Sequence, residues 1–565
     1  MNIRILSLIA ICLLIFSRCA DLDREVVVGL QEEQVVESYE YTKNRITAIY
    51  EGLPSGFNPI DDAMLSSATD DAEFTLQSSG VQRFNTGNWN AISNPDDVWY
   101  DLYQSIFDAN RFLETSDNVN LDVYRLDPSP SSQQVYANRL IEINRWKSEA
   151  MFLRAYFYFE LVKRFGGVPI LTKTYEIDDN YERIKRQSFD ECIKFITDQC
   201  DLVASQLPSE GKYSLSNLGR ATKGAALALK SRVLLYAASD LFNDPSWAGG
   251  YSRPELISSL NGDRMVKWKA AADAAKAVID QPDYSLSSSY GDLFYTYQNT
   301  EIILARREGS SNYFERINYP IGYDLGRSGN KPSQNLVDAY EMLDGTKFNW
   351  ENPAHTEDPY KNRDPRFYHT VLANDTIFKG RPIELWTGGR DGKGTERASR
   401  TGYYLRKYVN PNLNLLQGET SVHTWILIRL AEIYLNYSEA LNEYDPGNPD
   451  IKFYVDAVRA RSGINMPPLP SGLSQSEMRE RIRNERRVEL AFEGHRFWDV
   501  RRWLIAPENF GTPLQGVEIT RLDSAVYDYQ KINVETRVWE PKMYLYPIPQ
   551  SEILQMIDWE QNPMW

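Results

Sequence analysis

The sequence predicts a mainly α-helical protein in which tetratricopeptide-like helix pairs form a scaffold interrupted by a large loop-rich insertion with short strands. Apolar residues recur at helical spacing over long stretches. Alanine-rich faces at residues 221–228 and 270–277 allow neighbouring helices to approach closely, and the pairs repeat at roughly 30–40 residues. Between Pro282 and His423 this periodicity gives way to sequence rich in Tyr, Gly, Asn and Pro.

Each expected helix has an apolar stripe, and several have a clear end. Gly166 and Gly167 close one helix, and Pro208, Pro282 and Pro446 close others, because these residues favour turns over helix. Helices are expected at residues 97–116, 134–165, 189–206, 220–239, 265–280, 424–443, 451–461 and 476–504. Short strands are expected within the insertion at residues 302–306 and 403–408.

Two stretches of the chain lack long helices. One runs from Leu53 to Pro95 and is rich in Ser, Asn, Asp and Gly, and the other is the insertion. Binding residues concentrate in loops carried by a rigid scaffold. A structureless segment as long as the insertion is implausible inside a compact protein. We therefore expect a compact, loop-rich subdomain that binds a ligand.

Composition excludes several classes of function. The formal net charge is −16 at pH 7, which argues against a nucleic-acid partner because phosphate binding needs a net basic face. The four histidines lack metal-binding spacing, so no metal site and no cofactor are expected, although calcium binding is left open. Because the chain carries almost none of the spacings that identify an enzyme, no enzymatic activity is expected either. A glycosidase carboxylate pair is left open, since only separation in space decides it. Cys192 and Cys200 lie ~12 Å apart along one helix, too far for a disulfide, and are expected in the core.

The N-terminus has the features of an exported lipoprotein. Arg4 precedes an apolar run at residues 5–16, which suits a secretory signal and is short for a membrane span. We expect cleavage before Cys19 and acylation of this residue, since several acyl chains anchor durably where one does not. Removing residues 1–18 takes away Arg4 and Arg18 and moves the formal charge from −16 to −18. An ordinary signal peptide is the alternative.

Two segments rich in arginine and aromatic residues are the most distinctive part of the chain. They are Arg145–Pro169 (RWKSEAMFLRAYFYFELVKRFGGVP) and Ile482–Trp503 (IRNERRVELAFEGHRFWDVRRW). In the second segment, arginines and acidic residues lie three or four positions apart, the spacing of ion pairs within a helix. We interpret this segment as internally salt-bridged and packed, with His495 in a structural role.

Both segments resemble the signature helices of the RagB/SusD family, outer-membrane lipoproteins of Bacteroidetes-type bacteria that capture nutrients, mostly glycans. Further matches occur in family order at residues 69–74, 99–113, 331–340, 358–367 and 544–549. The resemblance implies a tetratricopeptide-like scaffold split by a large insertion. It divides the chain into a signal peptide (1–18), an N-terminal region (19–282), a ligand-binding insertion (283–422) and a C-terminal helical region (423–565).

The resemblance also implies a function. It indicates a non-catalytic, surface-exposed protein of the outer membrane that captures an oligo- or polysaccharide and delivers it to a SusC-like TonB-dependent transporter. The membrane contact would be the lipid at Cys19. A peptide-capturing relative that uses the same scaffold and transporter type is the alternative, and a surface glycosidase is a less favoured third class.

Family resemblance places the ligand contacts in the loop before the helix at 99–113 and in the insertion before residues 331–340. Aromatic side chains there would stack on the C–H faces of sugars, and polar side chains would bond the hydroxyls. The candidates are Asp71, Arg83, Trp89, Asn90, Tyr319, Tyr323 and Trp386. The alternative is that these aromatic residues fill small cores of the loop-rich subdomain.

Overall fold

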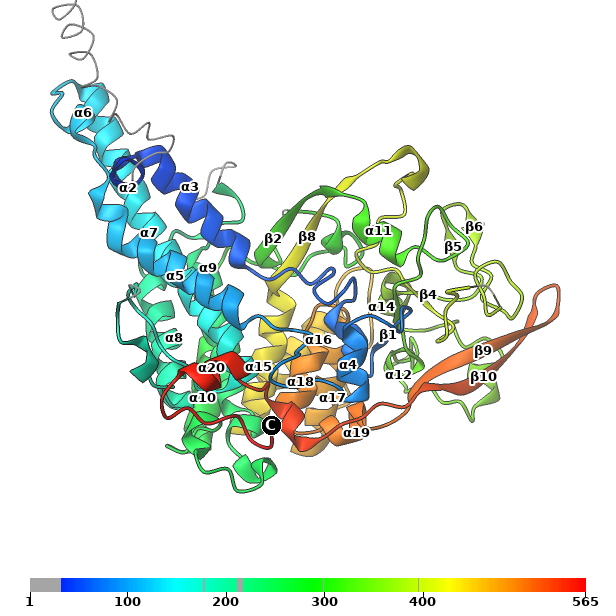
Figure 1. Ribbon diagram of the computed structural model, residues 1–565. Helices are drawn as coiled ribbons and strands as arrows, with labels where there is room; N and C mark the ends of the chain where they lie inside the picture. The colour runs from blue at the N-terminus through cyan, green and yellow to red at the C-terminus, as the bar shows by residue number, and fades with distance from the viewer. Residues whose placement is uncertain (1–31, 176–177, 211–216, 298, 395) are drawn as a thin grey trace, which may run out of the picture.

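The computed structural model describes residues 32–175, 178–210, 217–297, 299–394 and 396–565. Helices form one half of the molecule, and a loop-rich half with short strands packs beside them (Figure 1). The predicted fold class is therefore confirmed. Within the described ranges, no helix is both long and apolar enough to cross a membrane. The expected signal peptide and Cys19 lie outside the described residues.

The scaffold helices pack largely in chain order. Contacts run from α5 to α7, α8, α9, α10 and α15, and α16 and α17 then pack on α15. The bounds of the scaffold helices are α2 (Glu32–Glu37), α3 (Tyr39–Ile49), α5 (Trp99–Thr115), α7 (Pro130–Phe165), α8 (Phe189–Ala204), α9 (Lys223–Ala238), α10 (Arg264–Ile279), α15 (Leu430–Tyr444), α16 (Pro449–Arg459) and α17 (Gln475–Glu489). This succession of neighbours is the arrangement that the helix pairs in the sequence predict.

Local sequence explains where these helices begin and end. At the start of α8, the Ser188 hydroxyl accepts a hydrogen bond from the Glu191 backbone N–H, and the Glu191 carboxylate accepts one from the Ser188 backbone N–H. This reciprocal capping satisfies two donors that a helix start would leave free. Gly166 ends α7 with a φ of +73°, a conformation that favours glycine. Cys192 and Cys200 on α8 are buried and unpaired, as expected.

Antiparallel strand pairs organise the loop-rich half. One pair, β1 with β3, joins the first irregular stretch to the insertion. The pairs are β1 (Ala72–Phe74) with β3 (Asn330–Pro332), β2 (Ile302–Ser311) with β8 (Ser421–Arg429), β4 (Val371–Leu372) with β7 (Tyr404–Leu405), β5 (Ile377–Phe378) with β6 (Arg381–Pro382), and β9 (Leu514–Asp523) with β10 (Val526–Glu535). The short helices are α4 (Val81–Thr86), α6 (Asp122–Arg125), α11 (Tyr313–Asn318), α12 (Gln334–Val337), α13 (Pro353–Thr356), α14 (Pro365–Thr370), α18 (Arg496–Arg502), α19 (Ala506–Phe510) and α20 (Gln550–Gln555).

Three predictions of secondary structure were wrong in part. The helix expected at 424–443 begins only at Leu430, because the residues before it form β8 and pair with β2. The helix expected at 476–504 breaks after Glu489, since Phe492 and Gly494 adopt φ values of +61° and +79°. The expected C-terminal helical region also contains the β9–β10 hairpin, which projects from the loop-rich half in Figure 1.

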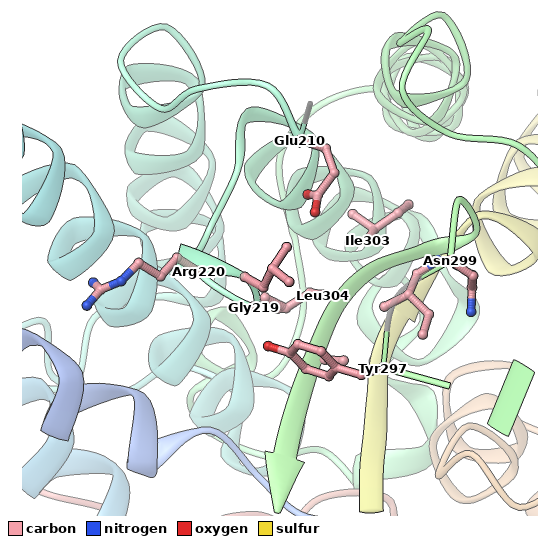
Figure 2. Close-up of a pocket in the computed structure, with 10 residues that line it drawn as sticks. Glu210, Gly219, Arg220, Tyr297, Asn299, Ile303 and Leu304 are labelled. Carbon is pink, nitrogen blue, oxygen red and sulfur yellow. Dashed lines mark hydrogen bonds between the residues drawn. The ribbon is translucent and has the colours of Figure 1, made fainter. Parts of the chain in front are cut away.

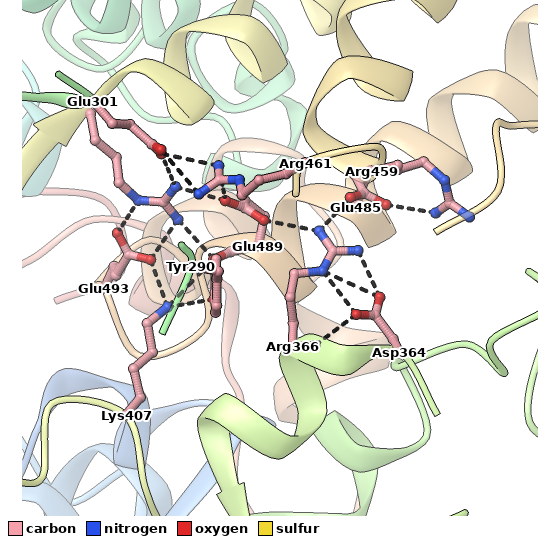
Figure 3. A network of polar contacts seen from close by, with 11 residues as sticks. Tyr290, Glu301, Asp364, Arg366, Lys407, Arg459, Arg461, Glu485, Glu489 and Glu493 are labelled. Carbon is pink, nitrogen blue, oxygen red and sulfur yellow. Dashed lines mark hydrogen bonds and ion pairs between the residues drawn. The ribbon is translucent and has the colours of Figure 1, made fainter. Parts of the chain in front are cut away.

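A buried network of ion pairs fixes the insertion to the scaffold (Figure 3). Arg429, at the end of β8, lies 2.8 Å from Glu301, 2.7 Å from Glu489 and 2.7 Å from Glu493. Arg366 of the insertion lies 2.9 Å from Glu489. Buried charges are tolerated when paired and hydrogen-bonded, so these contacts hold the two halves in one arrangement.

The arginines of the second signature segment are salt-bridged, but many of their partners come from other elements. Arg487 lies 2.8 Å from Asp70 of the first irregular stretch. Arg502 pairs at 2.5 Å with Glu439 of α15 and also with Asp499, three residues before it. Ion pairs confined to the helix were expected. Because α17 ends early and its arginines are buried or half-buried against other elements, carboxylates from neighbouring segments complete most pairs.

Candidate functional site

Trp89, expected to be a sugar platform, lies inside the protein. Its side chain is 3% exposed. Its ring centroid lies 4.9 Å from that of Phe84, 5.3 Å from that of Tyr546 and 4.5 Å from that of Trp565. Aromatic neighbours thus surround the indole in this structure, which corrects the expected role: Trp89 belongs to the core.

Asp71 and Tyr319 are also fully buried. The Asp71 carboxylate accepts a hydrogen bond from Arg487 at 2.7 Å, and burial raises the pKa of Asp71. Burial also favours a higher pKa for the adjacent Asp70, but the guanidinium groups of Arg487, Arg496 and Arg537 together outweigh this effect, and the pKa of Asp70 falls to about 2. The Tyr319 hydroxyl donates to the backbone carbonyl of Asn410 at 2.6 Å. Asp71 thus ties the first irregular stretch to α17, and Tyr319 is bonded within the insertion. Both residues belong to the core and not to the expected ligand site.

Arg83 and Asn90 lie together on the surface. Both side chains are exposed. The Arg83 guanidinium donates to the hydroxyl of Ser93, and the backbone of Asn90 pairs with that of Ser93. The Asn90 side-chain oxygen accepts from the backbone N–H of Ile92 at 2.9 Å. Arg83 and Asn90 therefore form a polar patch on the surface. The Trp89 ring does not contribute to this patch, because it is buried.

Tyr323 and Trp386 lie in the insertion and are half-buried. The Arg381 guanidinium lies 3.7 Å from the centroid of the Tyr323 ring. It also donates to Asp391 at 2.7 Å, and Asp391 follows shortly after Trp386 in the chain. The structure thus brings these two predicted aromatic residues into one part of the insertion.

Trp386 packs against the β9–β10 hairpin. Its ring stacks on that of Tyr527, with centroids 5.7 Å apart and planes inclined by 29°. The Arg521 guanidinium lies 4.9 Å from the Trp386 ring. Because Tyr527 and Arg521 are cross-strand partners, both contact Trp386 from the hairpin side. Sequence reasoning missed Tyr527, although the alternation of Tyr and polar residues from 527 to 530 was an available strand signal.

A groove of about 480 Å³ lies where three loop-bearing regions meet. Its walls are formed by Thr75 and Gln77 of the first irregular stretch, by Lys393, Gly394 and Arg397–Arg400 of the insertion, and by Ile532–Val534 of β10. A groove is thus present where the two irregular regions meet, the place at which the sequence predicts the ligand site. None of the seven predicted residues lines the groove.

The groove has apolar and hydrogen-bonding groups but no carboxylate among its lining residues. Arg397 is its least constrained cation, since its side chain is 50% exposed and the Glu396 carboxylate lies 3.9 Å away. Lys393 pairs with Glu518 at 2.7 Å, and Arg400 pairs with two carboxylates. The groove therefore offers donors and an apolar wall to a polar ligand.

A second hollow of about 660 Å³ lies between the scaffold and the loop-rich half. Helices α5 and α7, strand β8 and the turn at 492–495 line it. Glu160 and Lys163 on its wall are already paired at 2.7 Å, and burial lowers the pKa of Lys163 to about 8. Trp425 and Trp498 line it as well but are only 6% and 5% exposed. These parts of its wall are therefore engaged in the packing of the fold, whereas Asp101, Gln104 and Asp108 on the same wall are exposed.

Figure 2 shows a smaller hollow beside strand β2, with Glu210, Tyr297 and Asn299 on its walls. Its volume is about 40 Å³, whereas ligand sites typically measure ~300–1,000 Å³. Burial raises the pKa of Glu210. This hollow has room for small solvent molecules and not for a sugar ring.

The fold of this chain, a helical-pair scaffold that carries a loop-rich half, is also the fold of a solved SusD-like carbohydrate-binding protein. The chain belongs to the SusD family. The model described as "SusD family" matches residues 300–565, and the model described as "Starch-binding associating with outer membrane" matches residues 28–235. The predicted RagB/SusD membership is confirmed.

Individual relatives agree with this assignment. SusD-like protein P38 of Formosa agariphila is 23% identical over 548 residues, which cover 92% of this chain and 95% of the relative. A SusD-like protein of Bacteroides fragilis superposes with a TM-score of 0.78 at 29% identity, over 95% of this chain and 99% of that chain. A SusD-like carbohydrate-binding protein of the same species gives 0.74 at 25% identity, over 92% and 99%.

Proposed function

We propose that this protein captures a glycan at the cell surface and delivers it, without catalysis, to a SusC-like TonB-dependent transporter. Family membership supports carbohydrate binding, and one structural neighbour is described as carbohydrate binding. The single observation that carries the proposal is the groove at the junction of the first irregular stretch, the insertion and the hairpin.

The groove has the chemistry that a sugar requires. Sugar rings have apolar C–H faces, and Ile532 and Val534 offer apolar surface to such a face. The side-chain amides of Gln77 and Asn533 each carry donors and an acceptor, which match the dual character of a hydroxyl. Arg397 adds a cation whose single close carboxylate among the described residues is that of its exposed neighbour Glu396.

Trp386 extends this surface along the edge of the hairpin. The backbone N–H of Gly388, two residues after Trp386, donates to the carbonyl of Lys393 at 2.9 Å, and Lys393 lines the groove. A glycan longer than the groove would therefore reach the Trp386–Tyr527 pair. Arg83, Asn90 and Tyr323 remain proposed outer contacts, since part of each side chain reaches the surface.

The proposed location is the outer membrane, with the chain tethered by lipid at Cys19. The family description "Starch-binding associating with outer membrane" supports an association with this membrane. A lipid-tethered binding protein does not itself carry a solute across a bilayer, so uptake requires a partner pore. Affinity purification in mild detergent tests this part of the proposal: a large TonB-dependent transporter should copurify, and its absence would contradict delivery.

Calorimetric titration of the mature protein against a panel of oligosaccharides tests the binding proposal. We expect saturable binding of at least one glycan. Asn533→Ala should weaken that binding by about tenfold or less, the loss of one hydrogen bond. Asn138→Ala, an exposed asparagine on α7, is the matched control and should leave affinity unchanged. Binding of peptides with no binding of any glycan would overturn the proposal.

A further inference from the structure

The hollow between the scaffold and the loop-rich half has the size of a ligand site. Its volume is about 660 Å³, and sites for small molecules typically measure ~300–1,000 Å³. Residues of α5, α7, α9, β8 and the turn at 492–495 line it, so it forms only when both halves are packed together. The hollow and the groove share no lining residue, and the two are therefore separate sites.

Four hydrogen-bond donors in the wall of this hollow have no partner among the described residues. They are the hydroxyls of Tyr156 and Tyr236 and the indole N–H groups of Trp425 and Trp498. All four side chains are more than nine-tenths buried, and Tyr156 is only 1% exposed. None of the four donor atoms is fully enclosed, in contrast to the unpaired indole N–H of Trp89. The surface that these donors keep therefore opens into the hollow that they line.

The Trp425 indole is held rigidly in this wall. A Cβ at position 56 would overlap the indole, so Gly56 leaves the space that the ring fills. The centroid of the Trp425 ring lies 5.2 Å from that of Phe57. The ring also stacks on Tyr408, with centroids 5.3 Å apart and planes inclined by 28°. A donor fixed by packing loses little freedom when a ligand accepts its hydrogen bond.

The rim of the hollow supplies hydrogen-bond acceptors. Asp101, Gln104 and Asp108 line it and are exposed, and their spacing of three or four residues places them on one face of α5. Glu51, also exposed, lines the rim from the segment after α3. Among the described residues, neither Asp101 nor Glu51 forms an ion pair. Their carboxylates are therefore open to a ligand that donates hydrogen bonds.

The cations of the wall are already neutralised by carboxylates. The pairs are Lys163 with Glu160, Arg164 with Asp96, Arg232 with Glu432 and Arg306 with Glu308, at distances of 2.7, 2.9, 2.5 and 3.1 Å. Burial lowers the pKa of His495 well below its usual range, so this histidine of the wall is neutral. An anionic ligand would thus meet exposed carboxylates and no unpaired cation of the wall among the described residues.

We propose that this hollow is a second ligand site and that it binds a neutral mono- or disaccharide. A hydroxyl group both accepts and donates hydrogen bonds. The sugar oxygens would accept from the tyrosine hydroxyls and the indoles inside, and the hydroxyl protons would be donated to Asp101 and Glu51 at the rim. The volume of the hollow limits the ligand to a short sugar, whereas the open groove is proposed to take a longer chain.

Calorimetric titration of the mature protein with glucose, galactose, mannose, maltose, cellobiose and lactose tests this proposal. We expect saturable binding of at least one of these sugars. Tyr156→Phe keeps the ring and removes one donor, so it should weaken that binding by about three- to tenfold. Tyr434→Phe, which removes the hydroxyl of a half-buried tyrosine outside the hollow, is the matched control. Saturable binding of none of the six sugars would overturn the proposal.

Two further variants separate the hollow from the groove. Gln104→Trp places a bulky ring on the exposed face of α5 at the rim, so it should abolish binding of the short sugar while the protein stays folded. Asn533→Ala, in the groove, should leave that binding unchanged. Affinity that is unchanged in Gln104→Trp, or lost in Asn533→Ala, would overturn the proposal, whatever the effect of Tyr156→Phe. Crystals grown with the tightest-binding sugar should show its density within hydrogen-bond range of the Tyr156 hydroxyl.

Discussion

The guanidinium of Arg366 lies 2.9 Å from the carboxylate of Glu489, and the two side chains are 1% and 0% exposed. Arg366 belongs to α14 of the insertion, and Glu489 is the last residue of α17. This contact joins the loop-rich half to the second signature segment. The residues of the second signature segment therefore support the loop-rich half from within the protein. They do not form the proposed binding surface.

Breaking this contact from one side should destabilise the whole protein. Arg366→Met leaves Glu489 buried with one guanidinium fewer, and removal of one partner of a buried pair costs about 3–5 kcal/mol. Denaturant unfolding of the variant measures the loss. Lys194→Met, which breaks an exposed pair with Asp198 on α8, is the control and should cost about 1 kcal/mol or less. Equal effects in the two variants would contradict a structural role for the buried network.

Stability should fall steeply in acid. Burial favours a higher pKa for Glu439, but the guanidinium groups of Arg502 and Arg486 and the hydrogen bond from Trp503 together outweigh this effect, and the pKa of Glu439 falls to about 2. The same balance, with Lys163 as the leading cation, sets the pKa of Glu160 at about 2. A glutamate titrates near ~4.3 when unfolded, so these pairs contribute stability fully above that pH and lose it as the pH falls toward 2. Thermal unfolding across this range should show the loss, and Glu439→Gln should show a shallower one. A flat wild-type profile would contradict the pairing.

Long amphipathic helices could be predicted from sequence because their periodicity extends over many turns. The conformation of the segment before Leu430 could not be predicted in this way, because the apolar residues of Trp425–Arg429 fit both helical and strand spacing. Its pairing with β2, more than a hundred residues earlier, decides its conformation. The β9–β10 hairpin has alternating residues, but the arginine-rich helix before it favoured a helical interpretation of the whole C-terminal region.

The candidate site could be located from sequence more readily than its residues could be named. Loop composition identified the two irregular regions, and β1–β3 pairing does join them. Trp89 was wrongly expected at the surface. One of the rings packed against it is that of Trp565, the last residue of the sequence, and the residues around Trp89 do not indicate such a long-range contact. Gln77 and Asn533 carry no distinguishing local pattern, so only their meeting in space marks them as groove residues.

Trp89→Ala should reduce stability rather than act only on ligand affinity. Only 3% of the Trp89 side chain is exposed. Truncation of a core aromatic residue lowers the free energy of unfolding by about 3–5 kcal/mol. Denaturant unfolding of Trp89→Ala should show this loss. Wild-type stability in this variant, together with lost glycan binding, would restore Trp89 to the ligand site.

Cys19→Ala should release the protein from membranes. Lipid chains at Cys19 are the proposed anchor, and no helix of the described residues can replace them. Fractionation of cells that produce the variant should place it in soluble fractions, whereas the wild type should sediment with outer membranes. Intact mass should differ between the two by the acyl groups as well as by the substitution. A variant that stays membrane-bound would exclude Cys19 as the anchor.

A crystal structure of the mature protein with the tightest-binding oligosaccharide tests the central claim most directly. Our account predicts sugar density in the groove, with hydroxyls in hydrogen-bond range of Gln77 and Asn533 and the chain running toward Trp386. Density confined to the hollow between the scaffold and the loop-rich half, or over Arg83 and Asn90 alone, would contradict it.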